Sequence, residues 1–201
     1  MLSVGLTGNI ASGKSSVVSV WRRMGATIVD ADELSRRAVE PGTPGLAAIR
    51  ARWGDPVMDS EGRLDRGALR EIVFSDSLER QALEAIIHPE VARLRDEVHR
   101  TARKAGALIV VSDIPLLYEV GLEDQFDLVV LVDAPEQQRL ERLVRMRGLS
   151  REAAERMMAA QMPASAKRES ADYIIENDGT LDDLEAAALV LWRGLVEQSE
   201  R

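Results

Sequence analysis

One run of eight residues near the start of the chain has the composition and spacing of a phosphate-binding loop. Residues 8–15 fit the pattern G-x-x-x-x-G-K-[S/T], which is called a P-loop. Glycines let the backbone approach a phosphate that a Cβ atom would block, and the N–H groups of the loop then meet the anion together with the positive end of a following helix. The predicted nucleotide contacts are Gly8, Ala11, Ser12, Gly13, Lys14, Ser15 and Ser16.

Two side chains of this loop have separate predicted roles. Lys14 is a mobile point charge that can reach the β- and γ-phosphates of ATP, and the hydroxyl of Ser15 suits a Mg²⁺ ligand. An apolar run of strand type, residues 2–6, precedes the loop, and residues 16–24 contain no glycine or proline. Because a strand, a glycine-rich turn and a helix are the context that the motif needs, a glycine-rich turn with a surface lysine is the weaker interpretation.

Carboxylates follow two further apolar runs. Residues 26–32 end on Asp30 and Asp32, and residues 107–113 end on Asp113. The carboxyl ends of parallel strands face the ligand crevice of an open sheet, so these side chains are predicted to lie near the P-loop. Asp32 is the candidate for a chemical role, and Asp113 could hold Mg²⁺ through water. The alternative is that Asp30 or Asp32 caps the helix expected to begin near Asp32.

The stretch from about 34 to 105 interrupts the alternation of strands and helices. Helices are expected at 46–53, 66–74 and 78–105. The third is expected to be interrupted at His88-Pro89, because proline removes a backbone donor and restricts the residue before it. Such an insertion typically binds the second substrate beside a nucleotide core, although it could be a packing appendage. His88 could contact that substrate, or it could be a capping or core histidine.

Arginines are concentrated between residues 136 and 169. They are Arg139, Arg142, Arg145, Arg147, Arg151, Arg156 and Arg168. A solvated helix face is the usual explanation of such a run. After a P-loop core, however, arginines from a mobile lid neutralise charge as a phosphoryl group moves. Arg142 is the predicted catalytic arginine, and the choice among Arg139, Arg142, Arg145 and Arg147 stays open.

The apolar runs predict an α/β fold with a five-stranded parallel sheet in a three-layer P-loop core. The last two strands are expected at 127–133 and 171–177, and an amphipathic helix is expected from about 181 to 197. One domain would then comprise three parts. They are a core (about 1–33, 106–135 and 170–201), a helical acceptor-binding lobe (about 34–105) and a lid (about 136–169).

Composition limits the classes of function. The chain has 201 residues, 45% of them hydrophobic, and a net charge of −8. An acidic protein is a poor prior for a nucleic-acid binder. The absence of cysteine excludes disulfides and thiolate chemistry. We find no signal peptide, and the longest apolar runs are too short to cross a bilayer. We therefore expect a cytoplasmic protein with no nucleic-acid or membrane partner, acting as a monomer.

An ordered set of segments resembles the dephospho-CoA kinase family over nearly the whole chain. The segments are Leu6–Ser15, Val29–Asp32, Val39–Gly42, Leu64–Arg66, Leu69-Arg70, Val73-Phe74, His88-Pro89, Pro115–Glu119, Arg156, Gln161, Ala171–Asn177 and Gly179. The P-loop alone would indicate only an NTPase, whereas the whole set in order is highly specific. One departure is Asn9, where the family usually has glycine; a side chain pointing away from the phosphates should be tolerated there.

The resemblance implies a kinase that uses ATP and Mg²⁺ to phosphorylate the 3′-hydroxyl of the ribose of dephospho-CoA, the last step of coenzyme A synthesis. Carried over by position, Lys14 is the phosphate-binding lysine, Asp32 the candidate general base and Arg142 the lid arginine. The resemblance also implies a substrate-binding region. It contains Asp32, His88, Pro115, Leu116 and Leu117.

Three other functions compete with this interpretation. A kinase for another small acceptor, such as a nucleoside or nucleotide, would share the P-loop, lid and insertion. A regulatory switch that binds GTP would need an Asn-Lys-x-Asp element, which the chain lacks. A nucleotide-free structural protein would keep the P-loop without a purpose. Protection against thermal unfolding by ATP or by GTP would distinguish a kinase from the GTP-binding switch.

Overall fold

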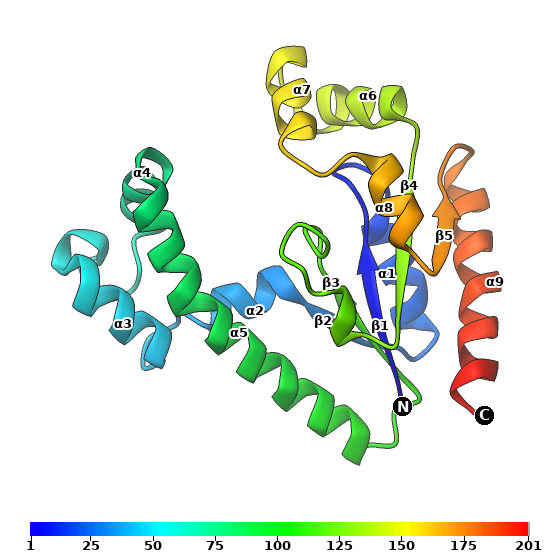
Figure 1. The fold of residues 1–201 in the computed structure, drawn as a ribbon, viewed down its shortest axis with the longest axis horizontal. Coiled ribbons are helices and arrows are strands. Elements are labelled where there is room, and N and C mark those ends of the chain that lie inside the picture. The colour runs from blue at the N-terminus through cyan, green and yellow to red at the C-terminus, as the bar shows by residue number, and fades with distance from the viewer. Residues whose placement is uncertain (201) are drawn as a thin grey trace. The chain divides into compact units, whose positions relative to one another are not determined.

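The computed structural model describes residues 1–200 and contains one five-stranded sheet. Its strands are β1 (Leu2–Thr7), β2 (Thr27–Asp30), β3 (Ile109–Asp113), β4 (Leu128–Asp133) and β5 (Tyr173–Glu176). The order across the sheet is β2-β3-β1-β4-β5, and β1 pairs in parallel with β3 and β4, as β4 does with β5 (Figure 1). The predicted five-stranded parallel sheet is confirmed.

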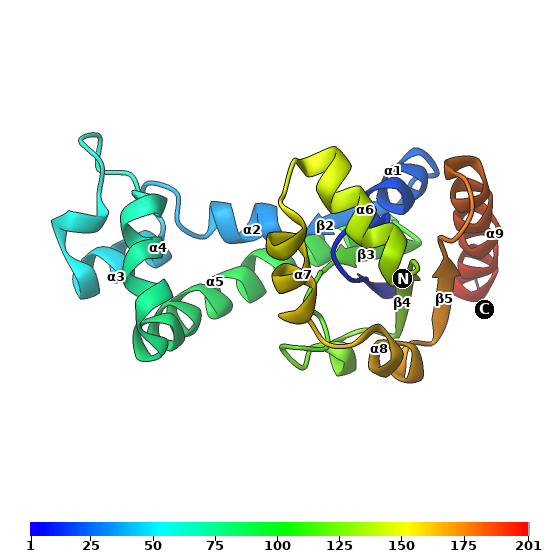
Figure 2. The same cartoon turned by 90° about the horizontal axis from the view of Figure 1, so that it is seen from above.

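The residues of β1 alternate between two layers that cover the sheet. Val4 and Leu6 belong to the core beneath α1 (Lys14–Arg23) and α9 (Leu181–Ser199). A Cβ atom on the intervening Gly5 would lie only 2.7 Å from Leu117 and 2.9 Å from Phe126, both in the segment that follows β3. Side chains that alternate in this way face opposite sides of a strand. Figure 2 shows α1 on one side of the sheet and α8 (Ala164–Ser170) on the other.

Two tryptophans join the helices of the first layer. Trp21 of α1 is fully buried, and its ring centroid lies 6.0 Å from that of Trp192 of α9. The indole N–H of Trp21 donates to the carbonyl of Ala188 at 2.9 Å. Large aromatic rings bury much apolar area, and their polar atom needs a partner when it is buried. These contacts attach the last helix of the chain to the helix that follows the P-loop.

The chain divides into two compact units, which we describe separately. The first contains Met1–Val29 and the chain from Ala102 onward, with the sheet, α1, α6 (Glu136–Arg147), α7 (Arg151–Ala159), α8, α9 and a short 3₁₀ helix, Glu123–Gln125. The second is Asp30–Thr101, with α2 (Ala31–Arg37), α3 (Pro44–Trp53), α4 (Arg66–Ser75), the 3₁₀ helix Asp55–Val57 and most of α5 (Ser77–Lys104).

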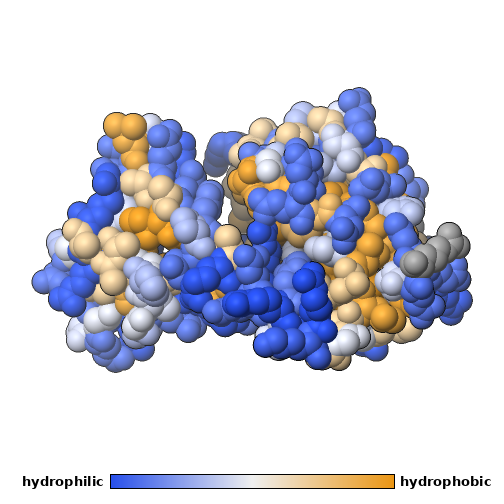
Figure 3. Space-filling model, turned by 60° about the horizontal axis from the view of Figure 1, so that its bottom comes forward, coloured by the Kyte–Doolittle hydropathy of each residue, from blue (hydrophilic) through white to orange (hydrophobic). Residues whose placement is uncertain are grey.

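The second unit has a small apolar core of its own between helices. Leu46, Ile49, Val57 and Leu69 are buried there, whereas Phe74 is 87% exposed. Figure 3 shows one face of the molecule, on which hydrophilic residues predominate and apolar residues form patches. Within residues 1–200, none of the helices combines the length and apolarity that a membrane span requires.

The expected interruption at Pro89 is wrong, because α5 is one helix of 28 residues with Pro89 inside it. Both His88 and Pro89 are exposed. A proline removes one helical hydrogen bond, to the carbonyl four residues earlier. That residue, Ala85, is also exposed, so water can satisfy its carbonyl and the helix continues past the proline.

Candidate active site

The P-loop connects β1 to α1 and contains two residues in the left-handed backbone conformation. Ala11 has φ 61° and Gly13 has φ 101°. Within the described part of the chain, Ala11 is the one non-glycine residue with a positive φ. That conformation costs a residue with a Cβ atom about 1–2 kcal/mol, and strain of this kind persists where surrounding contacts impose it, often at ligand sites.

The loop leaves no room for a side chain where it passes the sheet. A Cβ atom on Gly8 would meet the carbonyl oxygen of Val132 and would lie 2.6 Å from Oγ of Ser12. The Ser12 hydroxyl is itself buried and finds no hydrogen-bond partner among residues 1–200. A buried hydroxyl without a partner, in a loop where Gly8 has no room for a Cβ atom, suits a polar ligand.

The first turn of α1 presents backbone donors. Its N-cap is Gly13, which supplies no side chain to bond the free N–H groups. Four N–H groups at a helix start lack intrahelical partners, and with the helix dipole they bind anions. The exposed Ser15 lies in this turn, so its hydroxyl is available to a cation that accompanies a phosphate.

Lys14 forms an ion pair with the carboxylate at the end of β3. Its Nζ lies 3.3 Å from Oδ1 of Asp113, and both side chains are less than one fifth exposed. The parallel register places Asp113 beside Leu6, immediately before the loop begins. Ser15 and Asp113 are oxygen donors of the kind that Mg²⁺ prefers, so the residues present fit a Mg²⁺–nucleotide complex.

Two side chains hold the outer carbonyls of the loop. Nη1 of Arg142 donates to the carbonyl of Ala11 at 3.1 Å, and Nδ2 of Asn177 donates to the carbonyl of Ser12 at 2.7 Å. Nη2 of Arg142 also donates to Oδ1 of Asn177 at 3.3 Å and to Gln138 at 3.1 Å. The predicted lid arginine therefore contacts the P-loop itself.

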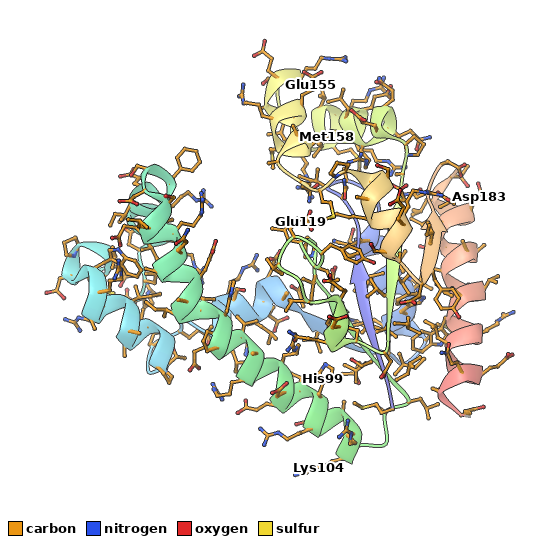
Figure 4. The ribbon with its side chains drawn as sticks, in the orientation of Figure 1. His99, Lys104, Glu119, Glu155, Met158 and Asp183 are labelled. Carbon is orange, nitrogen blue, oxygen red and sulfur yellow. The ribbon has the colours of Figure 1, made fainter. Side chains whose placement is uncertain are left out.

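The segment after α7 holds the other arm of the loop. The N–H of Ile10 donates to Oε1 of Gln161 at 2.7 Å, and Nδ2 of Asn9 donates to the carbonyl of Met162 at 3.1 Å. The side chain of Asn9 is thus turned toward residues 161–162 and bonded there. In Figure 4, Met158 is labelled near the end of α7, which precedes residues 161–162.

A small apolar cluster accompanies these hydrogen bonds. Its buried members are Leu140, Leu143 and Ala154, and the P-loop residues Ile10 and Ala11 pack against it. Apolar packing of this kind is favourable in proportion to the area removed from water. The helices α6 and α7 are therefore attached to the P-loop by both polar and apolar contacts.

The segment after β3 is held by a buried ion pair. Nζ of Lys167 lies 2.8 Å from Oε1 of Glu119, and the Lys167 side chain is fully buried. Lys167 also donates to the carbonyl of Pro115 at 3.4 Å, which accepts a second bond from the Thr7 hydroxyl at 3.2 Å. Oε1 of Glu119, labelled in Figure 4, also accepts the N–H of Met162 at 3.0 Å.

Removing this lysine is expected to destabilise the fold. In Lys167→Met, Glu119 loses its cation while it remains largely enclosed, and breaking a buried pair on one side typically costs about 3–5 kcal/mol. Urea unfolding should show this loss. The double variant Lys167→Met, Glu119→Gln keeps an acceptor for Met162 without a charge, so it should recover much of the stability. A single variant as stable as the wild type would contradict the structural importance of the pair.

The predicted acceptor residues of this segment differ in exposure. Leu116 is 44% exposed, whereas Leu117 is fully buried against Gly5 of β1. Leu117 therefore cannot contact a substrate in this conformation, because packing on the sheet occupies its side chain. Pro115 is partly exposed and begins the turn.

Asp30 and Asp32 take different roles in the second unit. Oδ1 of Asp30 accepts the N–H of Glu33 at 3.0 Å and caps α2. Asp32 lies in the first turn of that helix and is exposed. Of the two alternatives for the cap, the structure thus selects Asp30. His88 is exposed on α5 in the same unit.

Charged groups at the ends of β4 and β5 form a second network. Arg168 donates to Asp133 at 2.8 Å and to both carboxylate oxygens of Glu176 at 3.0 and 2.6 Å. The hydrogen bonds from Arg168 lower the pKa of Glu176, so this carboxylate stays ionised to a lower pH than usual. Burial raises the pKa of Tyr118 to about 12, which keeps that hydroxyl neutral.

Sequence reasoning missed three of the residues that touch the loop or its neighbours. Asn177 follows β5, and the rule that strand ends face the ligand could have identified it, as it did Asp113. Gln161 is among the residues that resemble the family but was given no role, and Lys167 carried no local signal of one. Within residues 1–200, no cluster of three or more histidine, aspartate or glutamate side chains is arranged to hold a metal.

The sequence and the fold of the chain are similar to those of known proteins. The family model for dephospho-CoA kinase matches residues 2–183. A dephospho-CoA kinase of Thermobifida fusca is 45% identical over 195 residues, covering 97% of this chain and 96% of that protein. A crystal structure of a Thermus thermophilus protein matches with a TM-score of 0.82 and 40% identity, over 96% of this chain and 97% of that one. The dephospho-CoA kinase from Campylobacter jejuni shares the fold, with a TM-score of 0.76 and 24% identity over 98% of both chains.

Proposed function

Because the chain belongs to the dephospho-CoA kinase family, we propose that it transfers the γ-phosphoryl group of ATP to the 3′-hydroxyl of the ribose of dephospho-CoA. The products are coenzyme A and ADP. The observation that carries the proposal is a family match over nearly the whole chain that includes the intact P-loop. Other acceptors and a regulatory switch are not favoured by this match.

The P-loop and α1 bind the nucleotide. The loop amides and Lys14 hold the β- and γ-phosphates, for which Lys14 exchanges its partner Asp113 for phosphate oxygens. Mg²⁺, when bound, neutralises the charge that develops on these oxygens. The hydroxyl of Ser15 and the carboxylate of Asp113 would hold it. The exposed Ser15 and the place of Asp113 at the end of β3 support these roles.

Asp32 acts as the general base. The 3′-oxygen of the acceptor attacks the γ-phosphorus, the bond from that phosphorus to the bridging oxygen breaks, and ADP leaves. The hydroxyl proton passes to the carboxylate of Asp32. Asp30 already caps α2, so Asp32 carries no capping role and its exposed carboxylate is available to a substrate.

Arg142 supplies positive charge beside the transferred group. Its guanidinium already contacts the P-loop through the carbonyl of Ala11, and a fixed cation beside a phosphoryl group stabilises the charge that develops in the transition state. We assign acceptor contacts to His88, Pro115 and Leu116. Leu117 supports the turn from below the surface, because its side chain is fully buried.

We assign one function to each of the three parts that the sequence predicts. Residues of about 34–105 form the acceptor-binding lobe, residues of about 136–169 the lid, and the remaining residues the nucleotide-binding core. We propose that the enzyme works as a monomer in the cytoplasm; the acidic, cysteine-free composition supports that location. Light scattering of the purified protein gives its molar mass and so tests whether it is a monomer.

A coupled assay of ADP release tests the reaction. The protein is supplied with ATP and Mg²⁺, and with dephospho-CoA, adenosine, AMP or no acceptor. Turnover with dephospho-CoA alone is expected. Turnover with adenosine or AMP alone would refute the assigned acceptor while leaving a kinase, and the absence of turnover with every acceptor would refute the proposed function.

Nucleotide choice can be measured without turnover. A ligand present at 100 times its Kd stabilises the folded protein by about 2.7 kcal/mol, because it binds the folded state only. We expect ATP with Mg²⁺ to raise the melting temperature by more than GTP does at the same concentration. Equal or greater protection by GTP would support the switch instead.

A further inference from the structure

We propose that Asn177 is a positioning residue for phosphoryl transfer, which fixes the Gly13 amide of the P-loop and the guanidinium of Arg142. This role deepens the proposed function and rests on it. Asn177 follows β5 and is 95% buried, since only 5% of it is exposed. Its backbone is fixed as well, because its N–H donates to the carbonyl of Asp133 at 2.7 Å.

The amide side chain of Asn177 sets the direction of one peptide group. Nδ2 donates to the carbonyl of Ser12 at 2.7 Å. In a planar trans peptide, the carbonyl of one residue and the N–H of the next point in opposite directions. Holding the Ser12 carbonyl outward therefore turns the N–H of Gly13 toward the inside of the loop. Within residues 1–200 that N–H has no hydrogen-bond acceptor, so it is free to bind a phosphate oxygen.

The packing at Gly13 makes this arrangement specific. A Cβ atom on Gly13 would meet Nδ2 of Asn177 and would lie 3.0 Å from Leu184. The left-handed φ of 101° also favours glycine there. The second glycine of the motif is therefore required twice, once by its backbone conformation and once by the side chain of Asn177 that lies against it.

The other end of the same amide holds the arginine. Oδ1 of Asn177 accepts Nη2 of Arg142 at 3.3 Å, while Nη1 of Arg142 donates to the carbonyl of Ala11 at 3.1 Å. One asparagine thus connects a loop that binds the phosphates to the cation placed beside them. Aspartate at this position would keep the acceptor but lose the donor.

The test separates positioning from stability with three variants. Asn177→Asp preserves the contact to Arg142 and turns an acceptor toward the Ser12 carbonyl. Asn177→Leu removes both contacts and keeps the branched shape of the side chain, although leucine is the larger residue. Ile175→Val, at a buried position of β5 two residues away, is the control for a loss of stability without a loop contact. Calorimetric ADP binding, kcat, both KM values and urea unfolding are measured for each.

Both Asn177 variants are expected to weaken ADP binding and to raise KM for ATP by about tenfold or more, the effect of misplacing one charge-assisted hydrogen bond. KM for dephospho-CoA should stay within about twofold, since Asn177 touches only the nucleotide side of the site. Asn177→Leu should also lower kcat more than Asn177→Asp does, because it releases Arg142. Ile175→Val should leave ADP binding unchanged.

Variants of Asn177 that bind ADP and ATP as the wild type does would overturn the proposal, as would an equal loss in Ile175→Val. If Asn177→Leu does not fold, Asn177→Asp alone decides by the same criterion. The comparison of ADP affinities does not depend on the acceptor. Failure of wild-type protein to phosphorylate dephospho-CoA would therefore refute the proposed function without deciding the role of Asn177.

Discussion

Asp32→Asn is expected to lower kcat by about a thousandfold, within the range for loss of a general base. An asparagine has nearly the same shape but cannot take the proton of the attacking hydroxyl. Binding of ATP should remain nearly intact, because the nucleotide is held by the P-loop and Lys14. Steady-state kinetics and calorimetric ADP binding measure the two effects separately.

The matched control is Asp30→Asn in the same segment. Asp30 caps α2 through its side-chain oxygen, and asparagine caps a helix about as well as aspartate does. This variant should therefore keep both stability and turnover. Loss of ATP binding with unchanged kcat in Asp32→Asn would contradict the assignment of the base, and so would an equal loss of turnover in both variants.

Lys14→Ala is expected to reduce both nucleotide binding and turnover, with kcat lower by about a hundredfold to a thousandfold, as for loss of one preorganised charge at the transition state. The lysine contacts phosphates in the ground state and in the transition state, so KM for ATP should rise as well. The variant also removes the ion pair between Lys14 and Asp113, so Lys14 no longer offsets the negative charge of that carboxylate near the loop.

An exposed lysine provides the control for this change. Lys104 lies at the end of α5 and is labelled in Figure 4. Lys104→Ala alters the net charge equally and should leave kinetics and ADP affinity unchanged. A Lys14→Ala protein that binds ADP as tightly as the wild type would contradict the proposed contact of Lys14 with the phosphates.

Local patterns in the sequence were sufficient to predict the sheet and the P-loop. The strands are short apolar runs, and β3 and β4 are buried almost throughout, as such runs predict. Asp113 was placed correctly because the end of a strand has a definite position relative to the loop. The choice between Asp30 and Asp32 as the cap, in contrast, depended on which carboxylate meets the N–H of Glu33, and the pattern allowed either.

The contacts that hold the loop could not be read from the chain, because they join distant residues. Asn177 and Ser12 are 165 positions apart, and Gln161 and Ile10 are 151 apart. Periodicity reports which face of an element is buried, but it does not report which partner a buried polar group finds. The continuity of α5 through Pro89 was missed for a different reason, since the exposure of that face decides whether a proline is tolerated.

The turn after β3, which we propose contacts the acceptor, has a consequence for the choice of that acceptor. Leu117 fills the space over Gly5, and the carbonyl of Pro115 and the carboxylate of Glu119 are each bonded to Lys167. A surface anchored in this way is preorganised, so an acceptor that meets it does not pay to order it. The same rigidity disfavours analogues of the acceptor, because the turn cannot adapt to a molecule of a different shape. Selectivity at this turn would then be determined by the shape of the acceptor when it binds, before the phosphoryl group is transferred.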